Sequence, residues 1–114
     1  MTPLWAYVAL GAAIVVGVGG QLLLKVGADG GGSVIAQFTR PVTVAGLGLY
    51  AVAALLYIVA LRRLPVSIAF PSVSLSYVIV AVAANHFWNE PFGWPQVAGL
   101  VLITAGVAVI HQAG

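Results

Sequence analysis

The sequence predicts an all-α membrane protein with four transmembrane helices in each chain. Its 114 residues are 62% hydrophobic and only 5% charged, whereas a soluble domain carries roughly 25% charged residues. The few charges and the prolines divide the chain into four apolar stretches, each close to the roughly 20 residues that a spanning helix needs. We therefore expect one transmembrane domain over residues 1–114 and exclude a water-soluble fold.

The first two spans are expected at about residues 4–25 and 41–61. No basic segment precedes the first apolar stretch, so we interpret it as a span and not as a cleavable signal. The glycine run at 30–32 predicts a flexible connection. Pro41 then suits the first turn of a helix, and the second span ends before Arg62.

The last two spans are expected at about residues 65–88 and 95–111, joined by the short turn "NEPFGW". Four spans place the second loop and both ends of the domain on one side of the membrane. That side carries Arg62 and Arg63, and the other carries Lys25 and Arg40. Because orientation follows the Lys/Arg excess, this balance favours insertion in both directions and an antiparallel homodimer; the alternative is one orientation fixed by the terminal amine or a partner chain.

The third span combines hydroxyl groups with a proline in its first half. Pro71 lacks a backbone N–H, so it frees a carbonyl one turn earlier, and polar groups in lipid must be satisfied inside protein or in a hydrated cavity. Each serine could instead bond its own helix. The cluster predicts one wall of a polar crevice, formed by Ser67, Ser72, Ser74, Ser76 and Tyr77.

The first two spans offer polar side chains to the same crevice. Gln21 and Lys25 continue a small-residue ridge on the first span at i, i+4 spacing. Lys25 lies near a membrane interface, where it either binds an anionic headgroup or simply snorkels to water. On the second span Tyr50 and Tyr57 share a face; both hydroxyls need partners, and packing against a neighbouring helix is the alternative.

Acidic residues are absent from the body of every span. Asp29 lies in a loop, and Glu90 follows the third span four residues after His86, with which it would form a titrating pair or a solvated interfacial one. The sequence carries no Ser/His/Asp grouping, metal-ligand spacing or nucleotide-binding glycine pattern, and no basic stripe for nucleic acid. We therefore expect no enzyme, no cofactor and no metal.

The segments "LPVSIAF" (64–70) and "GLVLITAGVAVI" (99–110) make the chain resemble the small multidrug resistance fold of the drug/metabolite transporter superfamily. Three separated motifs make it resemble most closely the ArnE/ArnF-type subfamily of aminoarabinose-phosphoundecaprenol flippases. The motifs are "GGQLLLK" (19–25), "PVSIAFPSVSLSYV" (65–78) and "WNEP" (88–91). The resemblance implies four-helix protomers that form an EamA-like dimer, in a homodimer or with a related subunit. Residues 99–110 resemble the family's dimer-forming helix, which implies packing at Gly99 and Gly106.

The chain departs from the drug exporters of that superfamily at the cation site. By alignment on Lys25, Gly17 stands where those exporters carry the first-helix glutamate, and Tyr50 keeps a binding-site tyrosine. Phe70 and Val73 replace a tyrosine and a tryptophan of the third helix. The resemblance therefore does not imply export of a lipophilic cation.

These residues fit a flippase for a polyprenyl-phosphate-linked sugar, and the resemblance implies that the sugar is of the aminoarabinose type and that the membrane is the bacterial inner membrane. Pro71 is expected to act as the hinge, and Glu90, with His86, to contact an amino sugar or a proton. The alternatives are a proton-coupled exporter of small cations and a non-transporting scaffold subunit of a glycosyltransferase system. Phosphate contacts are expected from Lys25, Arg62, Arg63 and Arg40, and sugar contacts from Gln21, Tyr50, Ser67, Ser72, Ser74, Ser76 and Tyr77.

Overall fold

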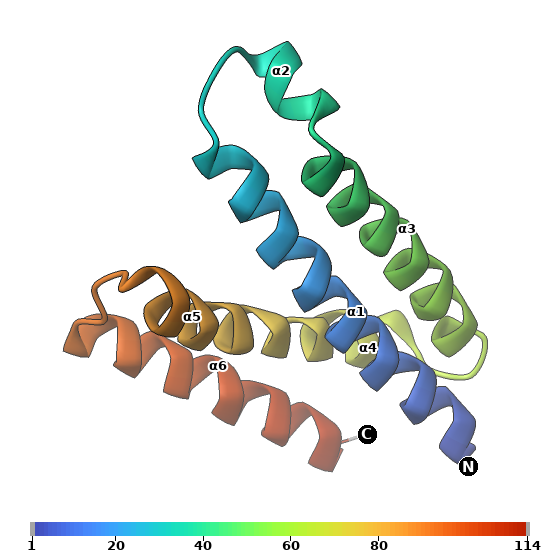
Figure 1. Ribbon diagram of the computed structural model, residues 1–114. Helices are drawn as coiled ribbons and strands as arrows, with labels where there is room; N and C mark the ends of the chain where they lie inside the picture. Colours follow the sequence, from blue (N-terminus) through green and yellow to red (C-terminus); the bar gives the residue numbers. More distant parts are fainter. Residues whose placement is uncertain (1, 114) are drawn as a thin grey trace.

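The computed structural model describes residues 2–113, and all regular structure in that range is helical (Figure 1). Four segments are long and apolar enough to cross a membrane, which confirms the predicted fold class. The third of these, Val66–Trp88, consists of two helices in series. The elements are α1 (Leu4–Asp29), α2 (Val34–Thr39), α3 (Pro41–Leu61), α4 (Val66–Val73), α5 (Leu75–Trp88) and α6 (Trp94–Ala113).

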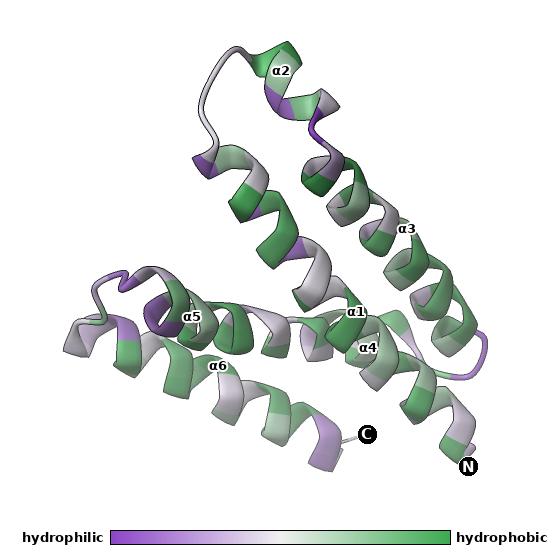
Figure 2. Ribbon diagram, viewed as in Figure 1, coloured by the Kyte–Doolittle hydropathy of each residue, from purple (hydrophilic) through white to green (hydrophobic). Residues whose placement is uncertain are grey.

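The helices form two antiparallel pairs that cross at a steep angle (Figure 1). One pair is α1 with α3, and the other is α5 with α6; α1 also contacts α5. Green, apolar segments dominate all the long helices, and purple, polar segments gather at their ends and connections (Figure 2). This distribution suits helices whose outer faces meet lipid chains.

Small residues allow α1 and α3 to pack closely. A Cβ added at Gly20 would lie 3.0 Å from the Gly46 carbonyl oxygen, and one at Gly46 would lie 3.0 Å from the Gly20 oxygen. Nearer the end of α1, a Cβ at Gly27 would lie 2.0 Å from Oγ1 of Thr43. Glycine at these positions lets the two backbones approach, which is how helices associate in lipid.

The connection between α1 and α3 contains a helix that the sequence did not lead us to expect. Oγ of Ser33 accepts a hydrogen bond from the Ala36 N–H (3.1 Å) and caps the six-residue α2. Helix α1 also continues one turn beyond the predicted end, to Asp29. In this connection Gly31 and Gly32 have φ of 70° and 86°, a backbone conformation that glycine adopts readily.

The third span is broken three residues after its proline. Helix α4 ends at Val73, and both the N–H and the hydroxyl of Ser74 donate to the Pro71 carbonyl before α5 begins. Proline removes a backbone donor and weakens the turn before it. The interruption therefore divides the span into two rigid pieces joined at Ser74.

A small apolar core closes one end of the molecule. Ala6 and Leu10 from α1 pack there with Ala60, Leu64 and Ala69 from α3, the following turn and α4. At the same end the His111 ring lies 6.4 Å from that of Tyr7, and its Nε2 lies 2.6 Å from Oγ of Ser72. These contacts join both helix pairs at the end that carries the α3–α4 connection.

Candidate functional site

A cavity of about 540 Å³ lies between three of the four spans. Its volume falls within the range of small-ligand sites. The wall is mostly apolar, and α6 contributes nothing to it. Lining residues are Ala13, Ile14, Gly17 and Gln21 from α1, Tyr50, Ala53, Ala54 and Tyr57 from α3, Phe70 and Val73 from α4, Ser76, Tyr77, Val80, Ala81 and Ala84 from α5, and Glu90.

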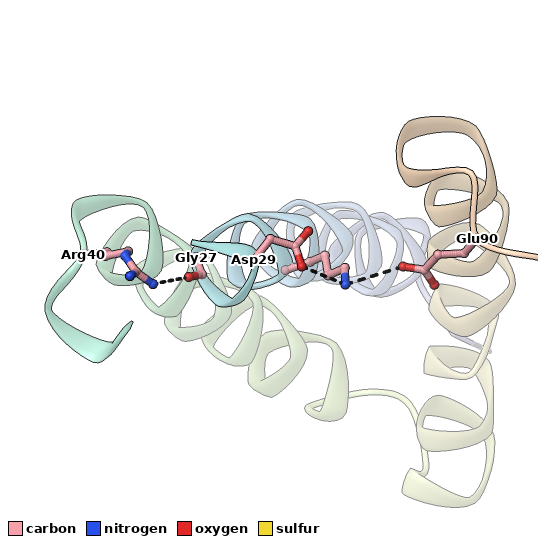
Figure 3. A network of polar contacts seen from close by, with 5 residues as sticks. Gly27, Asp29, Arg40 and Glu90 are labelled. Atoms are coloured by element: carbon pink, nitrogen blue, oxygen red, sulfur yellow. Dashed lines mark hydrogen bonds and ion pairs between the residues drawn. The ribbon is translucent and has the colours of Figure 1, made fainter. Parts of the chain in front are cut away.

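Glu90 lines one end of this cavity, and Lys25, which is not itself a lining residue, pairs with it there; we call this charged end the mouth. The Lys25 ammonium lies 3.0 Å from Oδ1 of Asp29 and 3.7 Å from Oε2 of Glu90, and Figure 3 shows the two carboxylates meeting it from either side. The side chains of Lys25 and Glu90 are 40% and 47% exposed. Ion pairs this exposed contribute little stability, so an anionic ligand can replace Glu90 beside the ammonium.

One turn deeper, Gln21 and Tyr50 form a neutral polar step. The Tyr50 hydroxyl donates to the Gln21 side-chain oxygen, and both residues line the cavity. This bond leaves the two amide N–H donors of Gln21 and an acceptor lone pair on Tyr50 available to a ligand. The step can therefore bind hydroxyl groups without adding charge.

Of the five predicted crevice residues on the third span, the structure brings Ser76 and Tyr77 to the cavity and leaves Ser67, Ser72 and Ser74 outside it. Ser72 is buried and donates to the Ile68 carbonyl (2.7 Å). Ser74 donates to Pro71, and Ser67 lies exposed on α4. The bonds of Ser72 and Ser74 to backbone carbonyls of their own span are the alternative that the sequence left open for each serine.

The arginines do not gather with Lys25 at the mouth. Nη1 of Arg40 donates to the Gly27 carbonyl at 2.7 Å (Figure 3), and Nη2 donates to the Gly31 carbonyl. Its guanidinium thus satisfies carbonyls at the C-terminal end of α1. Arg62 and Arg63 are exposed at the other end of α3, next to the closed end of the molecule.

Glu90 does not form the acid–histidine pair with His86 that the sequence suggested. The His86 ring packs edge-on against Phe87, with centroids 4.9 Å apart, while the Glu90 carboxylate turns to Lys25. The Asn85 side chain donates to the Glu90 carbonyl at 2.8 Å. This bond fixes the chain after α5, where Asn89 adopts a left-handed conformation, and so holds Glu90 at the mouth.

The lining residues that were not among the predicted site residues include two aromatic ones, Tyr57 and Phe70. Tyr57 lies seven residues after Tyr50, on the same helical face. That spacing was the signal for Tyr57 in the sequence, but packing against a neighbouring helix explains it equally well. The resemblance to the drug exporters gave a signal for Phe70, which stands where they carry a third-helix tyrosine.

The cavity is open along one side of the single chain. Phe70 and Tyr77, which line it, are 65% and 62% exposed. Gly99 and Gly106 lie on α6, in the other helix pair. A Cβ added at either glycine would have no neighbouring atom within 4 Å among the described residues. One chain therefore encloses part of a chamber and leaves α6 without a partner on this face.

Four apolar spans that enclose a cavity with a charged mouth and a polar step define a small multi-pass membrane protein. The chain belongs to the EamA-like transporter family, whose sequence profile matches residues 4–112.

Several curated proteins are similar to this chain. It is 42% identical over 82 residues to a protein of Shewanella sediminis named "Probable 4-amino-4-deoxy-L-arabinose-phosphoundecaprenol flippase subunit ArnF", a match that covers 68% of this chain and 57% of that protein. An ArnF protein of Erwinia tasmaniensis is 43% identical, over 68% of this chain and 65% of its own length. These matches thus span somewhat less than two thirds of each ArnF protein.

A relative of the ArnE type matches over nearly the full length. The "Probable 4-amino-4-deoxy-L-arabinose-phosphoundecaprenol flippase subunit ArnE" of Salmonella enteritidis PT4 is 35% identical over 118 aligned residues, 93% of this chain and 96% of that protein. No solved structure matches the chain.

Proposed function

We propose that this chain is a subunit of a flippase that moves a polyprenyl-phosphate-linked amino sugar across the bacterial inner membrane. The observation that carries the proposal is the ion pair between Lys25 and Glu90, which is the one charged residue among the described residues that line the cavity. The names of its relatives, which are aminoarabinose-phosphoundecaprenol flippase subunits, support the same class of substrate.

The Lys25 ammonium and the Glu90 carboxylate have signs opposite to the two charges of such a head. A phosphate takes the place of Glu90 beside Lys25, because charge-assisted hydrogen bonds between ammonium and phosphate are strong. The released Glu90 carboxylate then pairs with the ammonium of the amino sugar. Lys25 keeps its contact with Asp29, while its ion pair with Glu90 is exchanged for two with the ligand, so both charges of the head have partners at the mouth.

The cavity lowers the barrier that lipid imposes on the head. Placing one uncompensated charge at the bilayer centre costs at least about 2.5–3.5 kcal/mol. Gln21, Tyr50, Ser76 and Tyr77 line the cavity and exchange hydrogen bonds with the sugar as it advances, while the polyprenyl tail stays among the acyl chains. Arg62 and Arg63 are placed to receive the phosphate at the other interface.

Movement between the two sides requires a change in the third span. The break at Ser74 follows Pro71 and separates α4, which packs in the closed end and supplies part of the cavity wall, from α5, which supplies more of that wall. A change of the angle between α4 and α5 at this break moves α4 away from the closed end as α5 closes the mouth, and kinks at proline are the usual site of such bends. Pro71 therefore acts as the hinge.

A complete chamber requires a second chain. The exposed cavity wall and the free face of α6 both support a dimer, formed either with a second copy or with a related subunit. A homodimer would be antiparallel, as the balanced charges of the loops favour.

The test is transport by the purified chain in lipid vesicles. An impermeant amine reagent labels the amino sugar only in the outer leaflet, so flipping raises the labelled fraction from the outer-leaflet share to nearly all of the lipid. The chain alone suffices if the pair is a homodimer, and a co-purified related subunit is needed if it is a heterodimer. A labelled fraction that stays at the outer-leaflet share in both arms contradicts the proposal. Proton-driven uptake of a quaternary ammonium compound would instead identify a cation exporter.

A further inference from the structure

Tyr57 carries the one cavity-lining side-chain hydroxyl that is buried and has no hydrogen-bond partner among the described residues. Its Oη atom is inaccessible and unpaired, and the ring packs against the apolar core that closes the end of the molecule. The surrounding core residues, such as Leu10 and Ala60, offer only apolar side chains.

An unpaired buried hydroxyl is unfavourable for the folded protein. Leaving such a group unsatisfied costs about 1–3 kcal/mol, and buried polar groups almost always have partners. A phenylalanine would fill the same space without this loss. Because Tyr57 lines the cavity, a turn of its ring would bring the buried hydroxyl to the cavity, where a group from outside the chain can supply the missing partner.

Depth separates Tyr57 from the mouth. At 1.5 Å per residue, Tyr57 lies about 16 Å further along the helix axes than Lys25, with the Gln21–Tyr50 step between them. A single sugar ring is shorter than this separation, so a head whose phosphate contacts Lys25 does not reach Tyr57. No charged side chain lines the cavity at this depth, which favours an uncharged hydroxyl as the partner over a phosphate.

We propose that Tyr57 forms a second, deeper binding position, where its hydroxyl hydrogen-bonds a sugar hydroxyl after the head has left the mouth. This inference rests on the proposed flippase function and adds to it an intermediate state and a residue that selects for the sugar. The mouth recognises the charges of the head, and the deep position recognises its hydroxyl groups.

The experiment compares Tyr57→Phe with wild type, using Tyr7→Phe as the matched control, since Tyr7 lies outside the cavity at the same end of the molecule. Two lipids are tested, the amino-sugar polyprenyl phosphate and the bare polyprenyl phosphate. Equilibrium binding to the purified protein reports on the mouth, and the initial flipping rate in vesicles reports on passage through the deep position.

Tyr57→Phe is expected to lower the flipping rate of the sugar lipid about fivefold to tenfold, which corresponds to the free energy of one hydrogen bond. Its binding of the sugar lipid and its flipping rate for the bare lipid should be unchanged. Without lipid, its stability should equal or exceed that of wild type, whereas loss of a structural hydrogen bond would lower it. If Tyr57→Phe flips the sugar lipid at the wild-type rate, or slows both lipids equally, the role of Tyr57 is overturned while the flippase proposal stands. A wild-type protein that flips neither lipid overturns the flippase proposal, and this inference with it.

Discussion

At the scale of single residues, the contact between Gly27 and Thr43 sets how closely α1 and α3 approach near the mouth. Thr43 is 3% exposed, and its Oγ1 atom is buried without a hydrogen-bond partner among the described residues. A methyl group on Gly27 would overlap this oxygen. Gly27 lies two residues after Lys25, so the same contact holds the ammonium at its place.

Gly27→Ala is expected to destabilise the protein by about 1–3 kcal/mol, the usual range for overpacking a tight contact. Adding Thr43→Ala removes the overlapping oxygen and should restore part of the loss. Gly11→Ala is the control, because a Cβ there meets no atom within 4 Å. Reversible unfolding in detergent measures all four proteins, and equal stability of Gly27→Ala and wild type would contradict the packing described for α1 and α3.

The polar residues of the site were easier to predict from the sequence than the residues and helices that surround them. Lys25, Gln21 and Tyr50 were predictable because a cation, an amide and a phenol are rare inside apolar spans. Ser72 and Ser74 could not be separated from Ser76 in advance, since each hydroxyl can bond its own helix and the choice depends on how the span bends. The deep position of Tyr57 required knowledge of which helices surround it.

At the scale of elements, the long helices followed from composition and the short ones did not. Four apolar stretches bounded by charges and prolines determine four spans, because lipid permits little else. Helix α2 has only six residues and exposes all but Gln37 substantially, so it lacks a hydrophobic stripe to reveal it. The break at Ser74 depends on local hydrogen bonds to Pro71 that no hydropathy pattern encodes.

Helix α6 is the element whose surroundings the single chain leaves incomplete. It packs against α4 and α5 along one side, while Leu102 and Val109 are 72% and 62% exposed. Its glycines Gly99 and Gly106 are open to a neighbouring helix, and glycines spaced along a helix favour close approach in membranes.

Cysteine cross-linking tests the pairing of α6, and the chain has no native cysteine to interfere. For an antiparallel homodimer, Gly99→Cys in one copy and Gly106→Cys in a differently tagged copy should form a mixed disulfide, which requires Cα atoms within about 7 Å. Same-position cross-links would indicate a parallel pair. Gly11→Cys on α1 is the control, and cross-linking there as strong as at α6 would contradict the assignment.

At the scale of the whole molecule, polarity is arranged along one path through an apolar body. The ion pair at Lys25 marks one end of this path, the Gln21–Tyr50 step follows, and Tyr57 lies near the closed end. Arg62 and Arg63 lie beyond it at the opposite interface. This order of cation, neutral donors and cation suits an anionic head attached to a tail that remains in lipid.

The most direct test of this account is the lipid that the gently purified protein retains, identified by mass spectrometry. Wild type and Arg63→Gln are expected to retain a polyprenyl-phosphate amino sugar, and Lys25→Gln should lose it about tenfold or more, because it lacks the charge-assisted contact at the mouth. Equal retention of that lipid by Lys25→Gln and wild type would contradict the central role of Lys25.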